Sequence, residues 1–130
     1  MIRITVPALP PVEMSPNSRA HFFVKAKVSK QFKNDVFYCA RDVITKYRLG
    51  LFPLVVVKVE LTFIFRDNRR RDVDNMLGRF KPGMDALKAA GVIVDDDARH
   101  LQIGSVKIEV DKGRAPLTII DVTELNDGSY

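Results

Sequence analysis

The stretch from Val55 to Phe65 constrains the fold more than any other part of the sequence. Apolar side chains occupy every second position in it, and Lys58, Glu60 and Thr62 lie between them. A period of two places alternate side chains on the same face of a β-strand. The stretch therefore predicts a strand with one buried face, and the rest of the chain must supply the layer that covers it.

Three shorter segments also have strand character. Residues 2–6 alternate between apolar and polar side chains, and segments 101–110 and 117–124 are rich in β-branched residues. The last two are joined through Asp111-Lys112-Gly113-Arg114, a sequence that favours a tight turn. We therefore expect these two strands to form a β-hairpin.

Two segments have the period of helices. Apolar residues three or four apart predict one helix over 28–49 and a second over 75–90. Pro82 lies inside the second pattern and predicts a kinked helix or two abutting helices, and Gly91 is expected to end it. The resulting order, β-α-β-α-β-β, predicts the α+β class, with two helices packed on a mixed sheet.

The length and composition predict one small domain spanning 1–130. The chain has 130 residues, 46% of them hydrophobic, which is enough for one modest core. It contains no apolar run of the roughly 20 residues that a membrane helix needs, and the N-terminus lacks the apolar stretch of a signal peptide. We therefore expect a cytoplasmic protein with no membrane contact, and a frayed tail at 126–130.

The charge balance suggests a polyanionic partner. The formal net charge is +5, and small basic domains often bind nucleic acid. Residues 7–27 predict a long basic loop, in which Phe22 and Phe23 are interleaved with cations. The cations of this loop that we select as candidate DNA contacts are Arg19, Lys25 and Lys27. Such a loop either grips phosphates while its aromatic rings stack on bases, or is solvated while its phenylalanines return to the core.

A second cluster of charge lies after the longest predicted strand. Asp72 and Asp74 are two positions apart, so in extended chain both carboxylates point the same way. The acidic run Asp95-Asp96-Asp97 follows the second helix and can complete a site of the oxygen ligands that suit Mg²⁺ or Mn²⁺. The alternatives are a helix N-cap at Asp74 and a solvated turn at the acidic run.

Cations accompany these acids. Four arginines directly precede or adjoin Asp72, namely Arg66, Arg69, Arg70 and Arg71. They can hold phosphates while the acids hold a metal, or they can pair with the acids as surface salt bridges. Lys81 lies about two helical turns after Asp74, where it can stabilise charge on a phosphate or form an ordinary i,i+4 pair with Asp85.

Three motifs in this region match a known pattern. The segments RRRDVDN (69–75), KPGMDAL (81–87) and GVIVDDD (91–97) resemble, in order and spacing, the RusA family of Holliday-junction resolvases. The spacing between the first two motifs carries a short insertion relative to the best-known family pattern, so the reach of the lysine is a question for the structure.

The resemblance implies roles for individual residues. Asp72, Asp74 and Asp96 take the places of the metal-binding acids, with Asp95 as a further candidate ligand, and Lys81 takes the place of the functional lysine. The arginines before the first acid take the DNA-contact role. The metal implied is Mg²⁺, with Mn²⁺ as a substitute, and family members are homodimers that nick two opposed strands of a four-way junction.

These observations predict a metal-dependent endonuclease that resolves four-way DNA junctions in recombination and repair, in the cytoplasm of a bacterial host. Two alternatives remain, a non-catalytic module that binds branched DNA with the same fold, and a structural or interaction protein of phage origin. Metal-dependent cleavage distinguishes the first from the others. For the expected homodimer, an edge strand or the apolar flank of the second helix around Phe80 and Met84 is a candidate interface.

Overall fold

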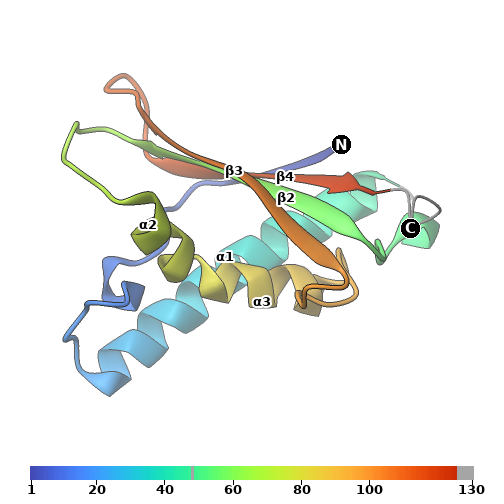
Figure 1. Ribbon diagram of the computed structural model, residues 1–130, viewed down its shortest axis with the longest axis horizontal. Helices are drawn as coiled ribbons and strands as arrows, with labels where there is room; N and C mark the ends of the chain where they lie inside the picture. Colours follow the sequence, from blue (N-terminus) through green and yellow to red (C-terminus); the bar gives the residue numbers. More distant parts are fainter. Residues whose placement is uncertain (48, 126–130) are drawn as a thin grey trace.

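A mixed four-stranded sheet lies against a layer of helices in the computed structural model, which describes residues 1–47 and 49–125 (Figure 1). The predicted α+β class is confirmed. The strands are β1 (Ile2–Val6), β2 (Val57–Phe65), β3 (Leu101–Val110) and β4 (Leu117–Glu124). The helices are α1 (Phe22–Lys46), α2 (Val73–Arg79) and α3 (Lys81–Ala90), with short 3₁₀ turns at Val12–Met14 and Leu49–Leu51. The tail predicted to fray lies outside the described residues.

The order of the strands across the sheet is β1-β4-β2-β3. β2 pairs with β3 in parallel and with β4 in antiparallel orientation, so β3 and β4 lie on opposite sides of β2. The predicted hairpin between β3 and β4 is therefore wrong. The chain does reverse after β3, but residues 111–116 pass the end of β2, where the Asp111 amide donates to the Phe65 carbonyl at 2.8 Å. Turn residues favour a reversal of chain direction but do not choose the strand with which the returning segment pairs. That choice is made by β2, an apolar strand that pairs along both of its edges.

The helices cover one face of the sheet and close the core (Figure 1). Phe80, which lies between α2 and α3, contacts Phe32 of α1 and Phe63 of β2 edge to face, with ring centroids 6.0 Å apart in both pairs. Phe80 is 0% exposed and Met84 is 8% exposed. The predicted dimer contact through these two side chains is therefore wrong, because the chain buries them in its own core.

The second helical pattern forms two helices, as the proline indicated. α2 ends at Arg79 and α3 begins at Lys81. Pro82 lies in the first turn of α3, where its missing N–H has no helical partner to lose. Gly91 ends α3 with a φ of +85°, as predicted for a C-cap glycine, and Arg41 of α1 donates to the Ala90 carbonyl at 3.0 Å.

The first helix is longer at its start than the apolar pattern indicated. α1 begins at Phe22, so the predicted loop over 7–27 is wrong for its last six residues. The His21 ring nitrogen Nδ1 accepts from the Phe23 amide at 3.2 Å and caps the helix. The early turns contain lysine and alanine, which favour helix, but bury no side chain before Phe32, and this is why no apolar stripe marked them.

Candidate functional site

A pocket of about 500 Å³ opens between α2, α3, β3 and the connection that follows α3. Three of the polar residues singled out in the sequence line it together: Asp74, Lys81 and Asp96. The rest of the lining is apolar except for a glycine, and consists of Leu77, Gly78, Met84, Leu101 and Ile103. The fold therefore brings one acid from each of two distant motifs to the same cavity, with a lysine between them.

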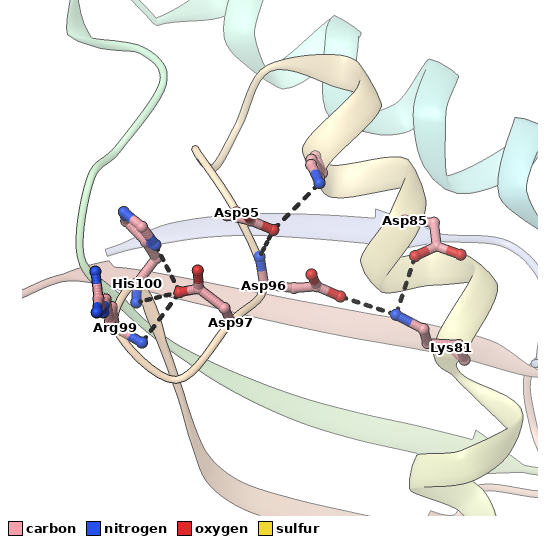
Figure 2. A network of polar contacts seen from close by, with 8 residues as sticks. Lys81, Asp85, Asp95, Asp96, Asp97, Arg99 and His100 are labelled. Atoms are coloured by element: carbon pink, nitrogen blue, oxygen red, sulfur yellow. Dashed lines mark hydrogen bonds and ion pairs between the residues drawn. The ribbon is translucent and has the colours of Figure 1, made fainter.

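The Lys81 ammonium contacts two acidic side chains. Its Nζ donates to Asp96 Oδ2 at 2.9 Å and pairs with Asp85 Oδ1 at 3.2 Å (Figure 2). The i,i+4 pair with Asp85 is therefore present, and the same ammonium also reaches Asp96, an acid of the predicted site; the role toward a phosphate stays a prediction. The hydrogen bond to Asp96, and then that to Asp85, raise the pKa of Lys81 above its ordinary value. The side chain therefore remains an ammonium at neutral pH, suited to stabilising negative charge.

The carboxylates of Asp95, Asp96 and Asp97 contact three different partners (Figure 2). The Asp95 carboxylate accepts from the Asp96 amide at 2.8 Å and pairs with Lys88 at 3.2 Å. These contacts, the amide first, lower the Asp95 pKa. Asp97 Oδ1 contacts the ring of His100 at 2.6 Å and, with the nearby amides, stabilises a turn. Of the three acids, Asp96 alone lines the pocket, and Asp95 is directed to a lysine outside it.

Asp72 and Asp74 do not share a strand. β2 ends at Phe65, and the expectation that both carboxylates extend from one strand face is wrong. Asp72 is the N-cap residue of α2 but its side chain makes no capping hydrogen bond, and Asp74 lies in the first helical turn. Asp74 Oδ1 accepts from the Asn75 amide at 3.0 Å. Asp74 lines the pocket, while Asp72 is exposed at its α2 side and is not among the lining residues.

The carboxylates of this pocket suit a metal ion held partly by waters and substrate better than a metal ion enclosed by protein ligands alone. Among residues 1–47 and 49–125, no group of three acidic, histidine or cysteine side chains is arranged to hold a metal ion. An all-protein cage is therefore not preformed. Mg²⁺, however, is commonly held by one or two carboxylates together with waters and substrate phosphates. Asp74 and Asp96, facing one cavity, fit that second mode.

The arginines of the β2–α2 connection differ in their availability. Arg66, Arg69 and Arg70 are exposed. The Arg71 guanidinium, by contrast, lies 3.6 Å above the Phe65 ring and bonds both the carbonyl and the carboxylate of Asp67. Its side chain is only 13% exposed. Arg71 therefore stabilises the connection. Arg69 forms a long ion pair with Asp67 at 3.8 Å but stays 84% exposed, so it remains accessible to a phosphate, as do Arg66 and Arg70.

Two further cations lie at the same end of the sheet. β2 and β3 are parallel, and their last residues, Phe65 and Val110, are partners in the register. The connection after β3 therefore leaves beside the arginine connection, and it carries the exposed residues Lys112 and Arg114. We interpreted these residues only as parts of a turn. Their charge was visible in the sequence, but the strand pairing that places them here was not.

The segment between β1 and α1 is anchored to α2 rather than loose. Arg79 Nη2 donates to the Pro10 carbonyl at 2.6 Å, and the Ser15 hydroxyl donates to Asn75 Oδ1 at 2.6 Å. Burial lowers the Arg79 pKa. A Cβ on Gly78 would lie 2.9 Å from the Pro16 ring, so only glycine permits this approach. These contacts position the helix that carries Asp74, and no periodic sequence signal marked them.

The basic residues near the start of α1 lie in two different settings. Arg19 and Lys27 are exposed, whereas Lys25 Nζ donates to the Ser18 carbonyl at 3.1 Å. Phe22 and Phe23 are each 73% exposed. The alternative in which these rings return to the core is therefore wrong.

Comparison with known proteins identified no relative of this chain. The sequence matches no protein-family model and no curated protein, so the resemblance to RusA resolvases rests on the three motifs and stays a prediction.

Across 1–47 and 49–125, no helix is both long and apolar enough to span a bilayer.

Proposed function

We propose that this chain is a metal-dependent endodeoxyribonuclease that resolves four-way DNA junctions during recombination and repair in a bacterial cytoplasm. The observation that carries the proposal is the convergence of Asp74, Lys81 and Asp96 on one pocket. α2, which holds Asp74, begins where the arginine-rich connection ends. A phosphate gripped by those arginines would therefore lie close to the acids.

The geometry of the pocket and the family resemblance together support the following roles for these residues. Asp74 and Asp96, which line the pocket, would hold Mg²⁺ or Mn²⁺. Asp72 is a candidate ligand from the family resemblance alone, since it does not line the pocket. When bound, such an ion lowers the pKa of a water and neutralises charge on a phosphate. The Lys81 ammonium, which lines the same pocket, would donate a hydrogen bond to a phosphate oxygen as the negative charge on that oxygen grows.

The apolar part of the pocket supports a nucleotide substrate. Leu77 and Met84 from the helices and Ile103 from β3 form a surface beside the charged groups. Sugar and base atoms next to the attacked phosphate can pack there, since ligand sites usually combine an apolar lining with a few directed polar groups. Arg66, Arg69 and Arg70 would hold flanking phosphates, which fix register but carry no sequence information.

Paired cleavage of a junction needs two such sites. Each chain supplies one pocket lined by Asp74, Lys81 and Asp96, so we propose a homodimer whose two-fold axis matches the near two-fold symmetry of the junction. β3 lies at the edge of the sheet and offers an unpaired backbone edge to a second copy. Light scattering at micromolar concentration, with and without junction DNA, would reveal the assembly, and a monomer mass in both samples would exclude it.

The proposal is tested with a synthetic four-way junction incubated with and without Mg²⁺. We expect wild-type protein to cut two opposed strands only with metal, and Asp74→Asn and Asp96→Asn to bind the junction but not cut it. Asp95→Asn is the matched control, because an amide oxygen can still accept from the Asp96 amide, and it should cut normally. Junction binding without cleavage by the wild-type protein under Mg²⁺ and Mn²⁺ would instead support a non-catalytic binding module.

A further inference from the structure

The N-terminal end of α1 projects beyond the core. The first buried side chain along this helix is Phe32, ten positions after it starts at Phe22. In Figure 1 this end of α1 lies farther from the sheet than the rest of the helix. Phe22, Phe23 and Val24 at this end are exposed, while Lys25 donates back to the Ser18 carbonyl and Val28 is partly buried.

Two phenylalanines are displayed at this tip. Phe22 and Phe23 are each 73% exposed, and their rings meet edge to face with centroids 5.6 Å apart. The His21 ring stacks on Phe23 at 5.3 Å, and its Nδ1 accepts from the Phe23 amide. The capping residue thus fixes a small aromatic cluster in water. Exposed clusters of large apolar side chains usually mark a contact with another molecule.

The surrounding charge restricts what that molecule can be. From Arg19 to Asn34 the sequence contains no acidic residue, and its cations are Arg19, Lys25, Lys27, Lys30 and Lys33. The same basic surface on a second copy would repel it, so charge complementarity favours a polyanion. Phe22, Phe23 and Val24 are consecutive and therefore point around the helix. They do not form the continuous apolar stripe with which a helix lies on a membrane surface.

We infer that Phe22 and Phe23 stack on DNA bases that are left unpaired or unstacked at the branch point of the junction, while the neighbouring cations hold the adjoining phosphates. Every base offers a flat π-face, so aromatic stacking of this kind tolerates any sequence. In fully paired duplex the bases are already stacked on each other and the rings have no target. This inference rests on the proposed DNA function and assigns the recognition of branched over linear DNA to the tip of α1.

The test compares binding of a four-way junction with binding of a duplex of equal length, by fluorescence anisotropy in metal-free buffer. For the double variant Phe22→Ala/Phe23→Ala we expect junction affinity to fall by about 5- to 150-fold for each stack lost. Duplex affinity should be unchanged. Phe22→Leu/Phe23→Leu, which keeps apolar bulk without a ring, should behave like the alanine variant. Tyr38→Ala is the control, since it removes a 69% exposed ring from the same helix far from the tip.

A base analogue locates the contact. With 2-aminopurine at the branch point, wild-type protein should change the fluorescence and the double alanine variant should not, while 2-aminopurine inside an arm should report no difference. All variants should melt like the wild type, because the rings removed are exposed.

Equal losses on junction and duplex, or retained junction preference in the double variant, would overturn the inference. Phenylalanine-dependent binding to phosphatidylserine vesicles without any effect on junctions would do the same and point to a membrane surface. These measurements need no cleavage, so an inactive wild-type protein would refute the proposed nuclease while leaving this contact testable.

Discussion

The exposure of Arg69 and Arg70 allows their expected effect on the salt dependence of DNA binding to be estimated. The Arg69 side chain is 84% exposed, and its nearest acid, Asp67, is 3.8 Å away. Arg70 is also exposed. If both hold DNA phosphates, each contributes about 0.9 to the slope of log affinity against log salt. Arg69→Ala/Arg70→Ala should therefore flatten the slope by about 1.8, so that a fourfold rise in salt weakens wild-type binding about 12-fold more than variant binding.

The control is an arginine from the same connection. Arg71 is 13% exposed, and its guanidinium is held by Phe65 and Asp67. Arg71→Ala should leave the salt slope unchanged while lowering the free energy of unfolding by about 1 to 2 kcal/mol through the lost stacking on Phe65. Anisotropy titrations at several salt concentrations, with urea melts in parallel, measure both quantities.

Two results would refute this reasoning. An unchanged slope in Arg69→Ala/Arg70→Ala would mean that these side chains serve their own chain and not DNA. A slope flattened equally by Arg71→Ala would mean that DNA responds to the overall field of the protein and not to particular contacts.

Three further predictions concern the helices and the acidic run. Lys81→Ala should lower single-turnover junction cleavage by roughly ten- to a thousandfold with little change in binding, whereas Lys88→Ala, a lysine of the same helix outside the pocket, should not; equal rate losses would refute this. Gly83→Ala should destabilise the fold by about 1 to 3 kcal/mol in a urea melt, because its Cβ would lie 2.6 Å from the enclosed ring of Phe80; unchanged stability would mean that the ring can yield. The contact with the His100 ring lowers the pKa of Asp97, so its contribution to stability is present above the ordinary aspartate pKa and should be lost as pH falls through the lower folded value. The stability difference between wild type and Asp97→Asn should therefore shrink below about pH 4, and a difference that grows there would contradict the assignment.

Local features of the chain could be predicted from sequence alone. The bounds of β1, β3 and β4 agree with the predicted strands, because alternation in β1 and β-branched composition in β3 and β4 are properties of successive residues. The break at Pro82 and the end at Gly91 were equally local, since ring geometry and the positive φ of a C-cap depend on a single residue. The α+β class follows from the order of these elements.

The candidate site could be predicted only in outline. The motifs named the acids, the lysine and the arginines, but neighbours in sequence are chemically equivalent until packing distinguishes them. Asp95 and Asp96 differ in their surroundings because the first pairs with Lys88 and the second with Lys81. Arg71 differs from Arg69 because Phe65 lies beneath it.

Tertiary structure alone decided which distant segments meet. Turn chemistry after β3 determined a reversal of direction, but the pairing of β2 on both edges determined that the chain would pass over it and bring Lys112 and Arg114 beside the arginine connection. The anchoring of Pro10 and Ser15 to α2 was decided in the same way. Contacts of this kind depend on backbone edges and cavities that exist only once the sheet and helices have assembled, so no short pattern in the sequence can encode them.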